Sequence, residues 1–517
     1  MSTTGDRSGA TVLPDTGRVD REEDARRLAE LGYEPRFNRE MSLAANFALG
    51  FTYLSPVVGV YALFAFALAE AGPPMVWSFF IVGAGQFLVA LVFAEVVSQY
   101  PIAGGVYPWA RRLWGRRYAW LTGWVYAWAL LITVASVAYG AGAFAATLLE
   151  VEGGVDFTIG TALVIIALAS AVNFSGTRNL SRAATAGFIA EIVGALVVGL
   201  YLIFFARENG PGVFFDSFGT AGEGTYLGAF LAAALIGLYQ FYGFEACGDM
   251  AEEVPDPGRR IPKAMMLTIL VGGAVAVMVV VGYVLAVPSI DAVVAGENPD
   301  PIGAVLTDVF GSVGSKIVLV VVLISFFSCT LSLQAAASRM IYAYGRDRMI
   351  FGSNALGAFS ERRHVPPGAL TVAVIVPALI VLGSRISEDA LTKIISFAAL
   401  GIYIAFQMVV LAALVARVRG WRPSGRFTLG RWGLLVNVLA LVYGVAAMVN
   451  LAWPRTPDAA WYDNYIVLLS AAIVLGAGLL YMVVARPYRH GTAAHGDAVG
   501  GRLTAESAPL EQKPRER

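Results

Sequence analysis

The sequence predicts an all-α integral membrane protein with twelve transmembrane helices. Its low charge, its long apolar stretches and the uneven distribution of its basic residues support this fold class. The 517-residue chain is 57% hydrophobic and only 14% charged, whereas soluble domains carry about 25% charged residues. Its mean hydropathy is +0.67. So little charge cannot cover the several soluble domains that this length would otherwise suggest.

A bilayer-spanning helix needs about 20 mostly apolar residues. Twelve stretches meet this requirement, and we expect the third and eighth to tilt or to extend beyond the bilayer because they are longer than needed. The predicted spans are residues 43–69, 76–98, 118–148, 158–174, 183–206, 226–250, 264–287, 316–344, 368–384, 391–415, 432–453 and 464–485.

The basic residues predict the orientation. If the N-terminus is cytoplasmic, all but five of the 37 Lys and Arg residues lie on the cytoplasmic side, which is the positive-inside pattern. Residues 1–39 and 487–517 are then cytoplasmic tails around a membrane domain of residues 40–486, and nothing resembles a cleaved signal peptide. The plasma membrane is the expected location. The five exceptions are Arg207, Lys316, Arg385, Lys393 and Arg455.

Several classes of protein are disfavoured by composition. Acidic and basic residues are equal in number, so no basic excess indicates nucleic-acid binding. Both cysteines lie in apolar stretches, which argues against a disulfide framework. The three histidines lie outside the apolar runs, and no Gly-Lys pair of a phosphate-binding loop occurs. We therefore expect no cofactor, no metal centre and no ATP-driven motor.

Two predicted spans are interrupted near their middle. In the first span, Pro56 removes a backbone donor, and Gly59 lets the chain depart from the helix. The sixth span contains Gly243 within an aromatic stretch. Either break alone is an ordinary kink, because Gly and Pro are frequent in membrane helices.

Together, the two breaks stand five spans apart, as an inverted 5+5 repeat over residues 43–206 and 226–415 requires. Paired breaks of this kind indicate the substrate site of a transporter. The predicted substrate-binding residues are Tyr53, Ser55, Pro56, Val57, Val58 and Gly59 at the first break and Tyr239, Tyr242, Gly243, Phe244 and Glu245 at the second.

Four carboxylates fall in or at the ends of apolar spans. A charge at mid-bilayer costs at least ~2.5 kcal/mol, so such residues face a cavity or a partner. Glu245, beside the second break, is the main candidate for a proton-carrying group. Glu191 in the fifth span is either a coupling residue or a protonated packing residue. Glu95 and Asp249 lie close to helix ends, where a structural role is favoured.

Three motifs in order resemble the amino acid/polyamine/organocation permeases. Residues 93–107 are similar to that family's signature between spans two and three. Residues 242–245, with the following 252–262, are similar to its span-six motif and loop. Residues 337–347 are similar to the end of its span eight. The resemblance covers nearly all of residues 40–486.

This resemblance implies the LeuT-type fold, with inverted repeats, two peripheral helices and alternating access around both breaks. It implies an aromatic gate at Tyr239 and a proton-sensing acid at Glu245. The Ser-Pro form of the first break is similar to the branch that carries γ-aminobutyrate, choline, ethanolamine and some amino acids. Glu191 stands where many proton-coupled members have a lysine, which a carboxylate cannot replace as a fixed cation.

The expected function is therefore a proton-coupled permease of small amino acids or related amines. Sodium coupling near Ser328 and Thr330, or exchange, is the alternative within the same fold. A sensor that binds without translocating is a third possibility. A membrane-integral enzyme is disfavoured, because the predicted spans contain no histidine to serve as a base or metal ligand.

Overall fold

The computed structural model describes residues 16–220, 225–385 and 388–499, and helices dominate this part of the chain. Ten helical stretches in it are long and apolar enough to cross a membrane. They are Leu43–Ala71 (α2 Leu43–Leu54 and α3 Pro56–Ala71), Pro73–Gln99 (ending in α4 Trp77–Gln99), α6 Arg116–Leu149, α7 Val155–Phe174, α8 Thr177–Phe205, α12 Pro257–Ala286, α14 Pro301–Arg346, Phe397–Val418 of α17 Glu388–Val418, Gly430–Ala452 (with α18 Gly433–Ala452) and α20 Ile466–Ala485.

Two shorter apolar helical stretches coincide with the remaining predicted spans. Tyr226–Gln240 contains α9 (Tyr226–Ala233) and α10 (Leu235–Gln240), and Pro367–Gly383 is α16. The predicted helical membrane fold is therefore confirmed, while the count of twelve spans and the inverted repeat stay predictions. Short helices complete the described chain: α1 Thr16–Glu30, η1 Pro73–Val76, α5 Val106–Leu113, η2 Pro211–Phe215, α11 Ala246–Asp249, η3 Ala251–Glu253, α13 Ile290–Val294, α15 Ser353–Leu356, η4 Gly430–Trp432, α19 Trp461–Asn464, η5 Pro487–Arg489 and η6 Asp497–Val499.

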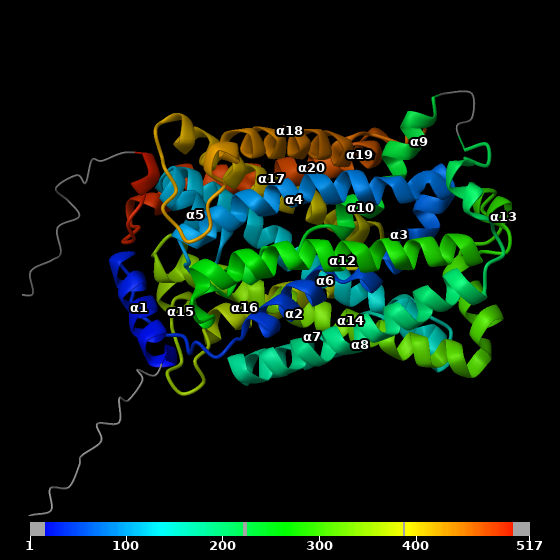
Figure 1. Ribbon diagram of the computed structural model, residues 1–517, viewed down its shortest axis with the longest axis horizontal. Coiled ribbons are helices and arrows are strands. Elements are labelled where there is room, and N and C mark those ends of the chain that lie inside the picture. Colours follow the sequence, from blue (N-terminus) through cyan, green and yellow to red (C-terminus); the bar gives the residue numbers. More distant parts are fainter. Residues whose placement is uncertain (1–15, 221–224, 386–387, 500–517) are drawn as a thin grey trace, which may run out of the picture.

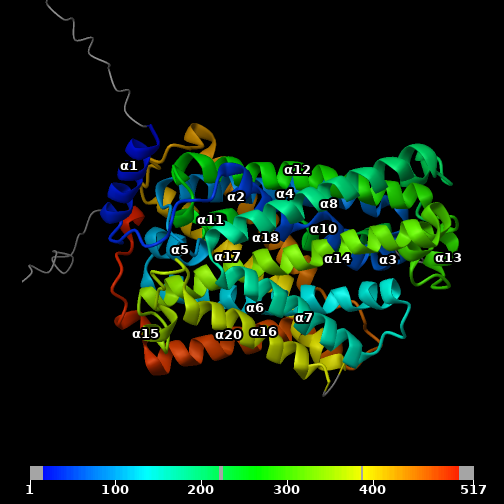
Figure 2. The ribbon, with the colours of Figure 1, turned by 90° about the horizontal axis from the view of Figure 1, so that it is seen from below.

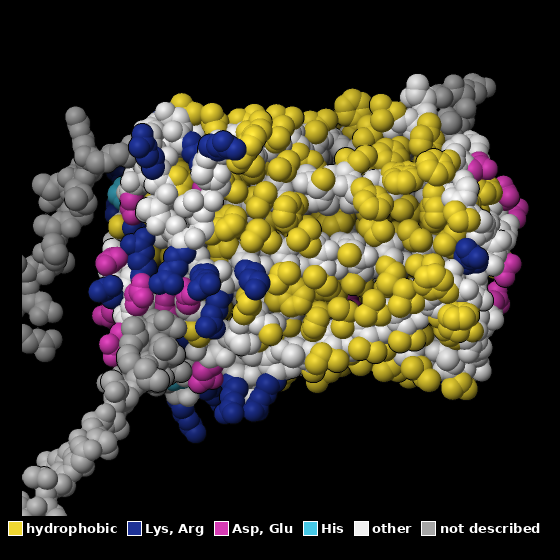
Figure 3. Space-filling view, in the orientation of Figure 1, with side chains coloured by type: hydrophobic (Ala, Val, Ile, Leu, Met, Phe, Trp, Pro, Cys, Tyr) yellow, Lys and Arg dark blue, Asp and Glu magenta, His cyan; other side chains and the backbone are white. Residues whose placement is uncertain are grey.

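The long helices run side by side along the longest axis of the molecule (Figure 1). Apolar side chains form a broad band across the middle of the visible face, and Lys and Arg gather at one end of it (Figure 3). Both described chain ends lie at that same end (Figures 1 and 2). We call it the basic end. An apolar band between polar ends is the surface expected of a protein that spans a bilayer.

Burial separates central helices from peripheral ones. In the most apolar stretch of Leu43–Ala71, and likewise of Arg116–Leu149, 72% of the residues are buried. The corresponding shares are 22% for Gly430–Ala452 and 11% for Ile466–Ala485. The interrupted first span is therefore central, and the last two candidate spans are the least buried of the ten.

Parts of both predicted tails fold onto the basic end. The backbone oxygen of Leu31, just after α1, accepts a hydrogen bond from Arg112 of α5, and Asp497 forms an ion pair with the same arginine. The hydroxyl of Tyr33 donates to the Asp347 carboxylate at 3.0 Å. The backbone N–H of Thr492 donates to the backbone oxygen of Asp347 at 3.2 Å. The two chain ends thus meet at α5 and at the end of α14.

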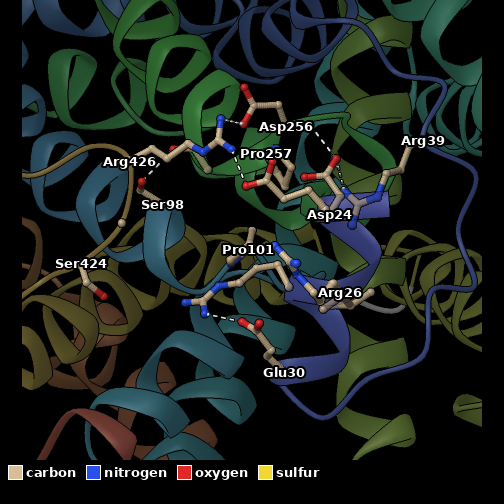
Figure 4. A pocket seen from close by; sticks show the side chains of 15 residues that line it. Asp24, Arg26, Glu30, Arg39, Ser98, Pro101, Asp256, Pro257, Ser424 and Arg426 are labelled. Carbon is tan, nitrogen blue, oxygen red and sulfur yellow. Dashed lines mark hydrogen bonds and ion pairs between the residues drawn. The ribbon is translucent and has the colours of Figure 1, made fainter. Parts of the chain in front are cut away.

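Helix α1 borders a charged cavity of about 270 Å³ with the start of α12 and the segment 424–426 (Figure 4). Arg426 forms ion pairs with Glu23 at 2.8 Å and with Asp256 at 3.2 Å. The backbone N–H of Asp256 donates to Asp24 at 2.8 Å. These contacts connect the N-terminal helix to two separate parts of the membrane domain.

Candidate functional site

The first span is broken at a single residue. Helix α2 ends at Leu54, α3 begins at Pro56, and Ser55 between them has φ 38° and ψ 93°. Proline is favoured at the start of a helix, where its missing N–H costs nothing. The Ser55 hydroxyl accepts a hydrogen bond from the backbone N–H of Val58 at 3.2 Å and so caps α3. The break is therefore a helix end and a new helix start, not a mere kink.

Gly59 does not release the chain from the helix, which corrects the expectation from sequence. It lies inside α3, and a Cβ atom there would come 2.2 Å from Oε1 of Gln240. Gln240 ends α10, and its side-chain amide donates to the backbone oxygen of Leu54 at 3.1 Å. Gly59 therefore provides room for a glutamine that binds the exposed carboxyl end of α2.

The second break lies between α10 and α11, over residues 241–245. Gly243 within it has φ 111°, a conformation that favours glycine. A Cβ atom at Gly243 would come 2.7 Å from the backbone nitrogen of Leu54. The structure therefore brings the two breaks into direct contact, although they are far apart in the sequence.

Three tyrosines from the two breaks form one aromatic group. The ring centroids of Tyr53 and Tyr242 are 6.2 Å apart, and those of Tyr239 and Tyr242 are 5.6 Å apart. The hydroxyl of Tyr53 is buried, and Glu245 of the second break is among its close polar neighbours. Phe244, also predicted to bind substrate, packs against Phe93 and Phe406 at centroid distances of 5.8 and 5.5 Å.

Glu191 of α8 reaches the first break. Its Oε1 accepts hydrogen bonds from the hydroxyl of Ser55 at 2.6 Å and from the backbone N–H of Val57 at 3.1 Å. Its Oε2 is buried and has no hydrogen-bond partner in the described chain. The carboxyl group therefore lies at the N-terminus of α3, where the helix dipole favours negative charge.

Glu245 is the last residue of the second break, directly before α11. Its Oε2 accepts a hydrogen bond from the backbone N–H of Gly243 at 2.8 Å, and its Oε1 lies 3.4 Å from the hydroxyl of Tyr126 on α6. The side chain of Glu245 is fully buried. The sequence-predicted acids at 191 and 245 are thus each attached to a different broken helix.

The predicted sodium ligands lie along α14. The Ser328 hydroxyl donates to the backbone oxygen of Ile324 at 2.8 Å, and the Thr330 hydroxyl donates to the backbone oxygen of Phe326 at 2.8 Å. Two neighbouring residues of α14 contact the first span: the Cys329 thiol donates to the backbone oxygen of Tyr53 at 3.3 Å, and the hydroxyls of Thr52 and Ser332 are 2.8 Å apart. No group of three or more His, Cys, Asp and Glu side chains that could hold a metal ion occurs within the described ranges.

Sequence reasoning missed Gln240, Tyr126 and the contact of Thr52 with Ser332. Gln240 carries a usable signal, because a lone amide directly before an interrupted helix can satisfy freed backbone groups. Tyr126, Thr52 and Ser332 have no such local signal in the sequence, so only their tertiary contacts reveal them.

Buried ion pairs lie between the breaks and the basic end. Arg339 of α14 pairs with Glu253 at 2.7 Å, and both side chains are fully buried. Arg346 pairs with Glu252 at 2.8 Å. Glu95, for which a structural role is favoured, forms an ion pair with Arg417 of α17. Such pairs join α14 and α17 to the segment after the second break and to α4.

Comparison with known proteins agrees with this architecture. Amino-acid permease BAT1 of Arabidopsis thaliana is 28% identical over 92% of this chain and 96% of that protein. The branched-chain amino acid permease BcaP of Lactococcus lactis is 27% identical, over 79% of this chain and 88% of its own. The thiamine transporter thi9 of Schizosaccharomyces pombe is 24% identical, over 91% and 87%. The model of the amino acid permease family matches residues 44–478. The chain therefore belongs to the amino acid permease family, a family of membrane transporters.

Proposed function

We propose that this permease moves small amino acids or related amines, such as γ-aminobutyrate, choline or ethanolamine, across the plasma membrane by alternating access, with protons as the coupling ion. The observation that carries the proposal is the contact between the two broken helices, with a buried carboxyl group at each. Unwound backbone and helix ends at such breaks serve as ligands for polar substrates in transporters. By the positive-inside pattern, the basic end faces the cytoplasm.

The polar groups at the breaks favour an amine over an acidic side chain. Residues 50–59 and 239–249 contain no Lys or Arg that could bind an extra carboxylate. The N–H of Val57 at the start of α3 already donates to Glu191, so that helix end is partly occupied by the protein's own carboxyl group. The rings of Tyr53, Tyr239 and Tyr242 provide faces that attract an ammonium or quaternary ammonium group.

The relatives do not choose among these substrates. One is named for branched-chain amino acids and another for thiamine, at 27% and 24% identity respectively. Relatives with nearly the same identity to this chain are therefore named for chemically different substrates. The substrate class proposed here rests on the site residues of this chain.

Proton coupling is proposed for Glu245 and Glu191, because a buried carboxyl group at a break can bind a proton in one state of the cycle and release it in another. Sodium coupling near Ser328 and Thr330, or substrate exchange, is the alternative. A binding protein that does not translocate is a further alternative that only flux distinguishes.

The test is uptake of labelled γ-aminobutyrate, choline, ethanolamine and a panel of amino acids into proteoliposomes, first with a proton gradient and then with a sodium gradient. We expect accumulation with the proton gradient alone, and we expect Glu245→Gln to abolish it without lowering expression. Asp156→Asn is the control, because Asp156 is an exposed carboxylate paired with Arg385 far from the breaks.

Each other result favours a named alternative. Accumulation that requires sodium would transfer the coupling site to the region of Ser328. Full activity of Glu245→Gln would remove the role assigned to that residue. Binding of a substrate without flux under either gradient would favour the sensor.

A further inference from the structure

A second buried carboxylate lies one helical turn beyond Glu245. Asp249 ends the short helix α11, and its backbone N–H donates to the backbone oxygen of Glu245 at 3.1 Å. Residues four apart on a helix share a face, so the two carboxyl groups point to the same side. Both side chains are fully buried.

One hydroxyl lies between the two carboxyl groups. The Tyr126 oxygen is 3.4 Å from Oε1 of Glu245 and 3.1 Å from Oδ2 of Asp249. A phenol carries a single proton, so it can donate to only one of the two acceptors. The other contact is satisfied when that carboxyl group is protonated and donates to the tyrosine oxygen. The three groups therefore match a site that holds one shared proton.

The second oxygen of Asp249 takes no part in the contact with Tyr126. Its Oδ1 is buried and has no hydrogen-bond partner among the residues that the structure describes. It faces the turn before α5, where a Cβ atom on Gly105 would come within 2.5 Å of it. The backbone N–H of Gly104 donates to the Asp249 backbone oxygen at 3.2 Å, which holds this end of α11 against that turn.

Within the described part of the chain, the neighbouring charges leave this pair of carboxyl groups without a counter-ion of its own. Arg339, the cation whose charge acts on Asp249, is engaged by Glu253 at 2.7 Å. Tyr53 and Cys247 are also titratable neighbours, but a phenol or thiol that carries its proton has no charge and cannot serve as a counter-ion. A proton on the pair relieves the repulsion between two buried carboxylates that no cation neutralises.

We infer that Glu245, Tyr126 and Asp249 form a proton relay between the second break and the basic end, an inference that rests on the proposed proton coupling. Helix α11 lies toward the basic end from the middle of the molecule (Figure 2). In one hop the proton of Glu245 passes to the tyrosine oxygen, while the tyrosine's own proton passes to Asp249. No charge is created or lost, because Glu245 becomes the carboxylate as Asp249 becomes the acid. Asp249 then passes the proton to a water molecule admitted from the basic end, which carries it away as hydronium.

The relay is tested with Asp249→Asn and Tyr126→Phe in proteoliposomes, by two fluxes. Accumulation driven by a pH gradient needs the proton to leave after each cycle, whereas counterflow exchange at equal pH cycles only between loaded states. We expect both variants to retain counterflow and to lose accumulation to the level measured with the gradient collapsed. A pH-sensitive dye inside the vesicles should report loss of substrate-induced proton entry. Tyr283→Phe is the matched control, because it removes a buried hydroxyl that bonds to Tyr61 instead.

Two results would overturn the relay. Accumulation by Asp249→Asn and Tyr126→Phe at the wild-type rate would show that neither group carries the proton. Loss of counterflow together with accumulation, in a variant of unchanged thermal stability, would make the residue part of substrate binding. If Asp249→Asn fails to fold, Tyr126→Phe decides, since phenylalanine keeps the ring. Wild-type uptake that ignores the pH gradient would instead contradict the proposed proton coupling, and this is seen before any variant is made.

Discussion

The hydroxyl of Ser55 donates to the carboxyl group of Glu191 at 2.6 Å, across 136 residues of sequence. Ser55 is the one non-helical residue between α2 and α3, and Glu191 belongs to α8. The contact fixes the start of α3 against a different helix and places a carboxyl group where the dipole of α3 favours an anion. A movement of α8 relative to α2 and α3 must therefore break or reform this contact.

Replacing Ser55 separates its two roles. Ser55→Ala removes the cap of α3 and should cost about 1 kcal/mol of stability, whereas Ser55→Gly suits the positive φ and should cost only a few tenths. Both variants lose the contact with Glu191, so we expect both to transport more slowly. Thermal unfolding in detergent and uptake in proteoliposomes measure the two effects. Wild-type uptake by Ser55→Gly would show that the Ser55–Glu191 contact is dispensable.

Gly59 and Gln240 should behave as a coupled pair. In Gly59→Ala the new methyl group would meet the Gln240 side chain, which must turn away and give up its hydrogen bond to Leu54. We expect Gly59→Ala to cost about 1–3 kcal/mol through overpacking. In the double variant with Gln240→Ala the added cost of Gly59→Ala should nearly vanish, because the methyl group then has room. Additive losses of stability would contradict this packing.

The extent to which the sequence predicts this structure differs between local and tertiary features. Apolar length predicts the helices because the bilayer imposes it, and Pro56 predicts the first break because proline lacks an N–H. The role of Gly59 is not predictable in this way, since a glycine that loosens a helix and one that makes room for a neighbour look the same in sequence. The contacts of Glu191 with Ser55 and of Tyr126 with Asp249 depend on how helices pack, which no local pattern encodes.

Removing one partner of the buried ion pair between Arg339 and Glu253 should destabilise the protein more than replacing both partners. Both side chains are fully buried, so Glu253→Gln leaves an unpaired buried charge and should cost about 3–5 kcal/mol. Arg339→Met combined with Glu253→Leu should recover much of that loss, because no charge is then left buried. The melting temperature in detergent checks this order. A double variant less stable than Glu253→Gln would contradict it.

The docked C-terminal segment should loosen as the pH falls. Partial burial, and then the charges of Arg116 and Arg111, lower the pKa of His495 below its usual 6.5, whereas Asp497 opposes them. The segment is held by hydrogen bonds from Gly496 to the Arg111 oxygen at 2.9 Å and from the Arg111 side chain to Ala494 at 3.0 Å.

The direction of the pH effect follows from proton binding. With its pKa lowered in the docked state, His495 binds more protons when the segment is released, so acidification below about pH 6.5 favours release. The protection of residues 490–497 from hydrogen exchange, measured against the intrinsic exchange rate at each pH, should therefore be lower at about pH 5.5 than at about pH 7.5. In His495→Gln the pH dependence should disappear while protection near pH 7.5 is kept. Equal pH dependence in that variant would show that His495 does not control the release.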